Sequence, residues 1–315
     1  MSVSVIVPSY QGDKRLPLLL EQFSRQKTER EWELIVVVDG STDNSAEVLA
    51  QWQEKLPLRA IIRSHNLGRS ATLNEGFEAA HYDILVRCDD DLVPAETYVE
   101  DFATAIETHP HSGVTGLYRN IFPENKYARI YGRRVDVRYE NEALAMPREK
   151  SWALWAGNCA VTRALWEEIG PYDQNFREYG WEDVDWGYRL FTAGHDIVLD
   201  PLLVTKHRLA ATTASIRLGR ARLSGRARTK FVAKHNVPNT PRPHSLWNSL
   251  MAACSLFAGT RWGSILDVAL NILPAPLSRK LIDLSVEAAF LRGEREANHL
   301  AKRPRDVAGT ARQAS

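Results

Sequence analysis

The chain has 315 residues, of which 44% are apolar and 25% are charged. This composition is ordinary for a globular protein with a sizeable core, and it excludes a chain that is disordered throughout. The 40 Lys and Arg residues nearly balance the 39 Asp and Glu residues, and the net charge of +1 argues against a dedicated nucleic-acid-binding protein. The balance hides a split, because residues 208–266 contain ten Lys or Arg and no acid, whereas residues 1–207 carry 22 basic and 33 acidic side chains.

The cysteines and the apolar runs indicate the compartment. Cys88, Cys159 and Cys254 are few, odd in number and without metal-binding spacing, which is typical of a reducing compartment. No apolar run reaches the roughly 18 residues that a spanning helix needs. We therefore expect a cytoplasmic protein, either free or peripheral on the inner face of the plasma membrane.

Strand and helix patterns alternate over the first hundred residues. Apolar β-branched runs at 3–7 and 34–38 predict strands, and apolar residues at helical spacing predict a helix at 16–26 between them. The same patterns predict further elements at 44–54 (helix), 59–63 (strand), 70–80 (helix) and 83–88 (strand). The alternation predicts an α/β fold with a mostly parallel sheet covered by helices on both faces. Ligands of such folds bind beyond the carboxyl ends of the strands.

The second half of the chain is less regular. Residues 110–150 show no clear pattern, and residues 152–207 again contain strand-like and helix-like pieces. The acid-free stretch predicts a long helix at 213–235, a Pro-containing linker at 236–244 and an amphipathic helix at 246–258. A further amphipathic helix is predicted at 278–293. We therefore divide the chain into a nucleotide-binding and catalytic domain (1–210), a basic helical extension (211–300) and a disordered polar tail (301–315).

Three consecutive carboxylates, Asp89, Asp90 and Asp91, follow a buried strand. Like charges so close together repel one another, and a divalent cation is the usual remedy. Carboxylate oxygens suit Mg²⁺ or Mn²⁺, and the alternate residues Asp89 and Asp91 point to one side. The alternative is a polar turn that caps the following helix.

Other polar side chains stand at the ends of predicted elements. Glu182 and Asp183 begin a helical pattern, where a carboxylate either serves as a general base or simply favours the helix dipole. His207 ends an apolar run and is either a metal ligand or a structural residue. Asp39 precedes Gly40, and it either binds a base or ribose or belongs to a good turn.

The order and spacing of these segments strongly resemble the family-2 glycosyltransferases of the GT-A fold. The resemblance rests on the segments VSVIVPSYQ, LIVVVDGSTDNS, NLGRSATLNEGF, CDDDLVP, WAGNCAVTRALWEEIGPYDQNF and GWEDVDWGYRL. It covers roughly residues 2–235. The stretch from Trp155 to His207 is also similar to the acceptor-side half of animal galactosyl- and N-acetylgalactosaminyltransferases.

The resemblance implies a role for each matching position. It places the nucleotide, with uracil as the common base, against Pro8, Tyr10, Asp39, Arg69, Asp89 and Asp90. It implies a metal held by Asp91 and His207, with Asp89 binding ribose or a metal-bound water. It makes Asp183 the base that removes the acceptor proton, with Glu182 binding sugar hydroxyls. It assigns the sugar and acceptor to Trp155, Gly157, Asn158 and Trp181.

This sequence departs from the family pattern at a few positions. Val38 stands where a first Asp is frequent, and Gln11 stands where Asn is usual. The third motif has Thr72-Leu73-Asn74 in place of Ala-Arg-Asn, so an expected arginine is missing. Arg69, close by in the sequence, is our candidate for supplying its charge.

The resemblance implies an inverting, Mn²⁺- or Mg²⁺-dependent transfer of a sugar from a nucleotide-diphosphate sugar, with UDP favoured. The acceptor would be a hydroxyl of a glycan or of a lipid-linked molecule, in cell-surface polysaccharide synthesis. A retaining enzyme of the same fold and a catalytically inactive sugar-nucleotide-binding subunit are the alternatives. The basic stretch is interpreted as a solvated helix face, a site for an anionic donor or acceptor, or a surface for an anionic membrane. The last helices also suit a homodimer interface, and no nucleic-acid partner is expected.

Overall fold

The computed structural model describes residues 1–177, 180–237 and 260–302. Its centre is a seven-stranded sheet with the order β3-β2-β1-β4-β8-β6-β9. The strands are β1 (Val3–Ser9), β2 (Trp32–Val38), β3 (Leu58–Ile62), β4 (Ile84–Cys88), β6 (Ser112–Thr115), β8 (Asn158–Thr162) and β9 (Asp196–Leu199). Strands β1 to β4 run parallel, and β8 runs antiparallel to both of its neighbours. The predicted α/β fold with a mostly parallel sheet is confirmed.

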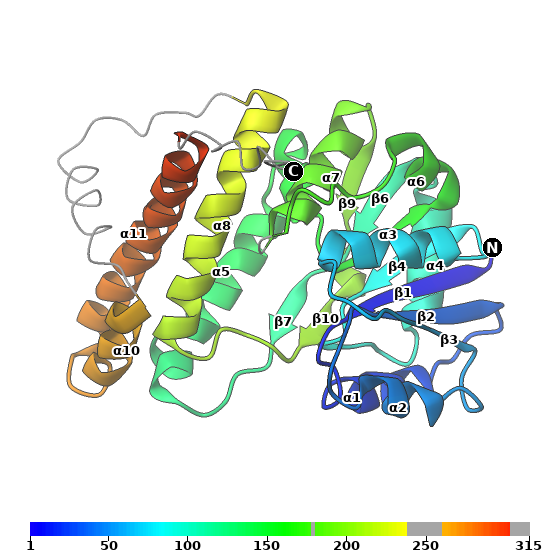
Figure 1. Ribbon diagram of the computed structural model, residues 1–315, viewed down its shortest axis with the longest axis horizontal. Coiled ribbons are helices and arrows are strands. Elements are labelled where there is room, and N and C mark those ends of the chain that lie inside the picture. Colours follow the sequence, from blue (N-terminus) through cyan, green and yellow to red (C-terminus); the bar gives the residue numbers. More distant parts are fainter. Residues whose placement is uncertain (178–179, 238–259, 303–315) are drawn as a thin grey trace, which may run out of the picture.

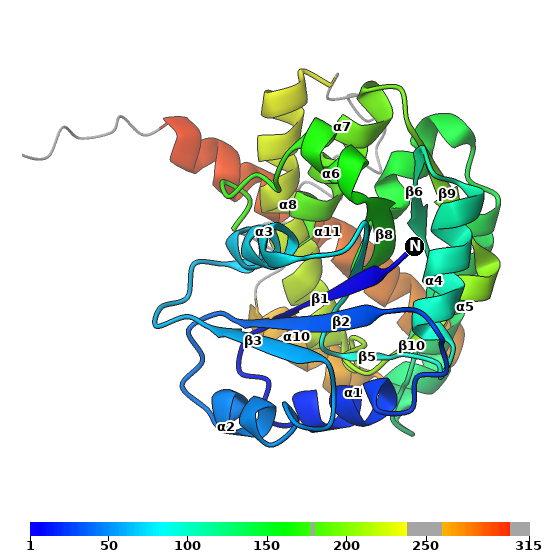
Figure 2. The same ribbon diagram turned by 90° about the vertical axis from the view of Figure 1, so that its right-hand side faces the viewer.

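Helices cover both faces of this sheet, as Figure 2 shows. Along β1, Val3, Val5 and Val7 pack into one core, and Ile6 packs into the other. The first core is closed by α1 (Leu16–Phe23), α2 (Ser45–Ala50) and α4 (Tyr98–Thr108), and the second by α3 (Arg69–Ala79), α6 (Arg163–Ile169) and α7 (Trp181–Thr192). Burial on both faces explains why the strands are apolar without alternation.

A second, three-stranded sheet joins distant parts of the chain. It consists of β5 (Leu92–Val93), β10 (Thr205–His207) and β7 (Tyr118–Asn120), with β10 in the middle. His207 pairs with Leu92 on one side and with Asn120 on the other. Asp91 directly precedes β5, so this sheet places it beside His207.

The stretch that showed no clear pattern, residues 110–150, is in fact largely structured. It contains β6, β7, a π-helical turn (Ala128–Gly132) and the helix α5 (Arg133–Leu144). Two short 3₁₀ turns follow it in the chain, at Arg148–Leu154 and Pro201–Leu203. Among the residues of α5, only Ala143 is buried. Sequence periodicity could not reveal this helix, because an almost wholly solvated helix has no apolar stripe.

Three helices form a separate layer beside the sheet domain: α8 (Ala214–His235), α10 (Thr260–Ala269) and α11 (Ala275–Lys302) (Figure 1). A Cβ at Gly225 would collide with the backbone of α11, and one at Gly293 would collide with the backbone of α8, so α8 and α11 pack closely. Helix α11 extends the predicted 278–293 at both ends. The expected helix 246–258 and most of the expected linker and tail lie outside the described residues. No helix within the described ranges has the length and apolar content needed to span a membrane.

Many cations of the acid-free stretch pair with acids from other elements. Arg222 and Arg228 of α8 pair with Glu296 and Glu294 of α11 at 2.8 and 2.5 Å. At its other end α8 meets the sheet domain, where Asp185 of α7 is fully buried. The oxygens of Asp185 contact the side chains of Arg189 (3.2 Å), Lys234 (2.8 Å) and His235 (2.7 Å). Arg222, Arg228 and Lys234 of the acid-free stretch are therefore neutralised inside the fold.

We expect Asp185→Asn to lower the free energy of unfolding by about 3 kcal/mol, because it leaves neighbouring cations without their buried counter-charge. Urea unfolding followed by circular dichroism measures the loss. The matched control is Asp173→Asn, which removes a charge that contacts the same Lys234 but is 21% exposed. The control should cost less than about 1 kcal/mol, and equal losses would contradict the assignment.

Candidate active site

Two adjoining cavities open at the carboxyl ends of the parallel strands. The first has a volume of about 350 Å³, and its lining includes Pro8, Tyr10, Asp39, Asp90 and Glu182. The second has a volume of about 540 Å³, and its lining includes Asp89, Asp91, Gly157, Asp183 and His207. Arg69 lines both cavities. The structure thus brings most of the predicted site residues to one edge of the sheet.

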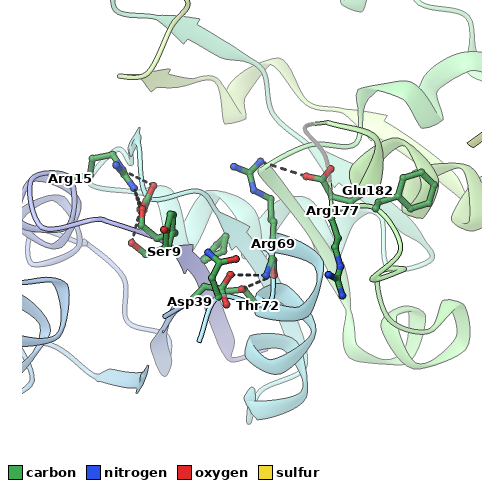
Figure 3. A pocket seen from close by; sticks show the side chains of 13 residues that line it. Ser9, Arg15, Asp39, Arg69, Thr72, Arg177 and Glu182 are labelled. Carbon is green, nitrogen blue, oxygen red and sulfur yellow. Dashed lines mark hydrogen bonds and ion pairs between the residues drawn. The ribbon is translucent and has the colours of Figure 1, made fainter. Parts of the chain in front are cut away.

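Asp39 lines the first cavity. Its carboxylate accepts hydrogen bonds from the backbone N–H of Leu67 (2.9 Å) and of Gly68 (2.8 Å), and Arg63 lies 3.3 Å away. These bonds fix the loop that precedes α3 (Figure 3). Gly40 follows with a φ of 63°, and a Cβ there would collide with the backbone of that loop, so the turn requires glycine.

Asp90 also lines the first cavity, and Figure 3 labels its partners Ser9 and Arg15. Ser9 Oγ donates to its Oδ2 at 2.6 Å, and Arg15 donates from Nε and Nη2 at 3.0 and 2.9 Å. Burial raises the pKa of Asp90 above its ordinary value, although Arg15 and Ser9 oppose the shift. The predicted nucleotide-binding carboxylate therefore lines the cavity, but its oxygens are occupied by donors of the chain itself.

Asp91 and His207 form the centre of the second cavity. His207 Nε2 lies 3.1 Å from Asp91 Oδ2, whereas Asp91 Oδ1 is buried without a hydrogen-bond partner. Burial alone would raise the pKa of Asp91, but the hydrogen bond and charge of His207, together with Arg69 and Arg15, bring it below its ordinary value. Asp91 is thus an ionised carboxylate with an unused oxygen.

These two residues suit a divalent cation, because they offer a carboxylate oxygen that lacks a partner beside an imidazole nitrogen. Within residues 1–177, 180–237 and 260–302, no group of three or more His, Cys, Asp or Glu side chains could hold a metal ion by itself. A cation here would therefore take its other ligands from water or from substrate oxygens, as Mg²⁺ commonly does.

A buried arginine that the sequence analysis did not select connects two predicted site residues. Arg87 of β4 is fully buried, and its Nε donates to Asp89 Oδ1 at 2.9 Å. Its Nη1 donates to Asp183 Oδ1. Guanidinium keeps its charge at any ordinary pH, so Arg87 is a permanent counter-charge between the two carboxylates. A cation inside the apolar run ILVRC, two residues before Asp89, was the available signal.

Glu182 and Asp183 are neighbours in sequence but line different cavities. Glu182 is buried in the first cavity, where Arg69 Nη1 lies 3.5 Å from its Oε1 and the Gly180 N–H donates to its Oε2. Burial and the neighbouring charge of Asp183 raise the pKa of Glu182 to about 7. Arg69 also lies 3.9 Å from Asp89, and Figure 3 shows it pointing toward Glu182. It thus lies beside one carboxylate of each cavity, and its contact with a nucleotide stays a prediction.

Two residues of the predicted sugar and acceptor set line the second cavity. A Cβ at Gly157 would collide with the carboxylate of Asp89, and the Gly157 carbonyl accepts the Asp89 N–H at 3.0 Å. Trp155 is 2% exposed and stacks on Trp186 with ring centroids 4.8 Å apart. Trp155 therefore gives the cavity a rigid apolar wall with little free ring surface.

The other two, Asn158 and Trp181, are used within the protein. Asn158 is fully buried, donates to the Leu203 carbonyl at 2.8 Å and accepts from Tyr98 Oη at 2.9 Å. Trp181 Nε1 donates to Ser224 Oγ of α8 at 2.9 Å. Neither is among the lining residues of the two described cavities, and contact of either with a sugar stays a prediction.

Residues 4–170 match the family described as Glycosyl transferase family 2, and this match covers more than half of the chain. The chain belongs to this family, and it is therefore a glycosyltransferase. The predicted family resemblance is confirmed. The finer likeness of residues 155–207 to animal galactosyltransferases stays a prediction.

Curated relatives share only part of their length with this chain. It is 24% identical to the chondroitin synthase of Pasteurella multocida (strain Pm70) over 62% of this chain and 23% of that protein. It is 40% identical to the undecaprenyl-phosphate 4-deoxy-4-formamido-L-arabinose transferase of Proteus mirabilis (strain HI4320) over 56% of this chain and 48% of that protein. The matches thus span less than half the length of either relative.

A solved structure agrees with the whole fold. The mannosyltransferase PcManGT from Pyrobaculum calidifontis, in complex with GDP-Man and Mn²⁺, matches with a TM-score of 0.63 at 19% identity. The match covers 96% of this chain and 88% of that one. At this identity the likeness shows the fold alone, which is the predicted GT-A fold with a helical C-terminal part.

The contact between Gly157 and Asp89 predicts the effect of a single methyl group. In Gly157→Ala the new Cβ must displace the Asp89 carboxylate, and with it the bonds from Arg87. For the Mn²⁺-dependent UDP binding that the sequence predicts, we expect the affinity in calorimetry to fall at least about tenfold, since a displacement near 1 Å can cost far more. Gly219→Ala is the control, because a Cβ at Gly219 meets open space and Gly219 lines neither cavity. An unchanged affinity in Gly157→Ala would contradict the assignment.

The raised pKa of Glu182 predicts a pH-dependent stability difference. In the unfolded chain this carboxyl titrates near 4.5, and in the folded chain near 7. The unfolded state therefore loses the proton first, and the stability contributed by Glu182 falls as pH rises from about 5 to 7. Glu182→Gln lacks this loss, so it should gain stability relative to the wild type across that window in urea unfolding. A difference that is constant from pH 5 to 8 would contradict the shift.

Proposed function

We propose that the chain is a metal-dependent, inverting glycosyltransferase that moves a sugar from a nucleotide-diphosphate sugar, with UDP favoured, to a hydroxyl group. The observation that carries the proposal is the shared cavity of Asp183, Asp91 and His207. A candidate base and a candidate metal pair lie in one space, and the cavity with Asp39 adjoins it through Arg69.

The donor nucleotide occupies the first cavity in this proposal. Asp39 has used three of the roughly four acceptor sites of its carboxylate on Leu67, Gly68 and Arg63. The remaining site can accept an N–H of a base, which supports the inference from the family pattern that it reads uracil. Arg69, at the junction of the two cavities, is suited to the diphosphate that would pass from one to the other.

Asp91 and His207 would hold Mn²⁺ or Mg²⁺. When bound, the ion supplies charge stabilisation for the leaving diphosphate. The unpartnered Asp91 Oδ1 supports this proposal, as does the presence of Mn²⁺ in the complex of the fold relative.

Asp183 would serve as the general base. Its pairing with the fully buried Arg87 holds its carboxylate in place. It takes the proton of the acceptor hydroxyl while that oxygen bonds to the anomeric carbon and the bond from this carbon to the diphosphate breaks. Attack from the face opposite the leaving group inverts the anomeric centre. NMR of the product anomer tests this against the retaining alternative.

The acceptor is proposed to be a glycan or a lipid-linked molecule of cell-surface polysaccharide synthesis. The printed names of the relatives, a chondroitin synthase and an undecaprenyl-phosphate transferase, support this class. Helix α10 exposes Ile265 and Val268 on the side that carries Arg261, and Ile272, just beyond the end of the helix, is 79% exposed. This face suits an anionic membrane surface, and it suits a second copy of the chain as well.

We expect Asp183→Asn to lower turnover at least about 100-fold, because general-base catalysis contributes 10²- to 10⁴-fold. UDP affinity should change less than about twofold. Asp183→Asn is nearly isosteric and can keep one bond to Arg87, so a thermal-shift check of folding accompanies the assay. Release of UDP from a panel of UDP-sugars measures turnover, and calorimetry measures binding. Substantial residual turnover would rule out Asp183 as the base.

The metal site and the preference for uracil in the donor nucleotide are tested separately. Asp91→Ala should abolish the gain in UDP affinity that Mn²⁺ gives, because it removes one of the two protein ligands. Asp173→Asn serves as the control carboxylate outside the cavities. The same titration with GDP compares the two nucleotides. Unchanged Mn²⁺-dependent affinity in Asp91→Ala would exclude this metal site, and tighter GDP binding would overturn the preference for UDP.

A further inference from the structure

A chain of hydrogen bonds continues behind His207, away from Asp91. His207 Nδ1 lies 2.6 Å from Asn120 Oδ1, at the end of β7. The amide nitrogen of Asn120 donates to Asp136 Oδ1 of α5, and the Asn120 backbone N–H donates to Asp136 Oδ2 at 3.0 Å. Asp136 thus holds both the side chain and the backbone of Asn120.

The chemistry of these groups determines which atom donates in each of these hydrogen bonds. An ionised carboxylate only accepts hydrogen bonds, so the NH₂ group of Asn120 must face Asp136. The carbonyl oxygen of Asn120 then faces His207, and because it also only accepts, Nδ1 must carry the imidazole proton. In the neutral ring Nε2 is left with a lone pair, and it is this atom that lies 3.1 Å from Asp91 Oδ2.

We propose that Asn120 and Asp136 are positioning residues that hold His207 in the tautomer whose Nε2 ligates a divalent cation together with Asp91. The inference rests on the metal site of the proposed function. With the Nδ1 proton directed at Asn120, Nε2 is the ring nitrogen that faces Asp91 Oδ2, and Asp91 Oδ1 beside it has no partner. A cation bound between them would satisfy all three atoms. A carboxylate or carbonyl behind a ligating imidazole is the usual means of orienting the imidazole.

The surroundings fix the imidazole ring from its sides as well. His207 and Asn120 are paired residues of the parallel strands β10 and β7. The ring of Tyr118, on the same strand as Asn120, lies 5.4 Å from the imidazole. Strand β7 therefore contributes both a packing partner and the polar partner of His207, and α5 contributes the carboxylate that orients the latter.

The first test measures metal affinity. In Asp136→Asn the new amide can donate or accept, so Asn120 is no longer forced into one orientation. We expect the Mn²⁺ affinity of the full chain with UDP, measured by calorimetry, to fall about 10- to 100-fold in Asp136→Asn and in Asn120→Ala, as for other outer partners of metal ligands.

The matched control is Glu140→Gln. Glu140 lies one turn further along α5 and pairs with Arg119 at 2.8 Å, so the variant loses the same charge from the same helix. Its Mn²⁺ affinity should stay within about twofold of the wild type. An equal loss in this control would reduce the effect to general electrostatics and overturn the proposal.

The second test reads the tautomer directly and needs no metal or turnover. In the metal-free protein at pH 8, ¹⁵N NMR of the imidazole, assigned with His207→Gln, should show the proton on Nδ1. Asp136→Asn should move population to the Nε2–H form. A neutral wild-type ring that carries its proton on Nε2 alone would overturn the proposal.

The outcomes separate this inference from the proposed function. If the wild type binds Mn²⁺ and both Asp136→Asn and Asn120→Ala bind it equally well, the positioning role is wrong and the metal site stands. If the wild type binds no Mn²⁺, the metal site itself is wrong, and so is the positioning role of Asn120 and Asp136.

Discussion

The fully buried guanidinium of Arg87 is the charge around which the candidate site is arranged. A cation in the centre of a sheet carries a large desolvation cost, which only close counter-charges can offset. Its two counter-charges, Asp89 and Asp183, come from a strand end and from a helix 96 residues away. These ion pairs offset the cost of burying Arg87, and they also fix the distance between the end of β4 and the start of α7. The proposed chemistry takes place between these two chain segments.

The small sheet and the two cavities are arranged around these ion pairs. With β4 ending at Cys88, the chain turns through its three aspartates, and each takes a different partner: Arg87, Arg15 and His207 in order. Strand β10 brings in the last of these partners between β5 and β7. A single acidic triplet is thus divided among a core ion pair, the wall of one cavity and the centre of the other.

The sequence was sufficient for elements and positions whose signals are local. Apolar strands, their connecting helices and carboxylates at strand ends could be predicted, because burial and turn chemistry act within a few residues. The pairing of Arg87 with Asp183 could not be predicted, since an ion pair across 96 residues has no local signature. Helix α5, with one buried residue, had no apolar stripe to detect, so Asp136 went unnoticed. Glu182 and Asp183 line different cavities because successive residues of a helix point about 100° apart. Which cavity each one lines could not be predicted, because it depends on the position of α7 relative to the sheet.

The pairing of α8 with both of its neighbours bears on how the C-terminal helices relate to the rest of the enzyme. A boundary near residue 210 separates motifs in the sequence, yet the end of α8 supplies Lys234 and His235 to a carboxylate buried inside the sheet domain. The extension is therefore not an interchangeable module. A chimera that joined this catalytic domain to the helices of a relative would need both sides of the Asp185 contact to come from the same parent, so we expect the two parts to be inherited as a unit.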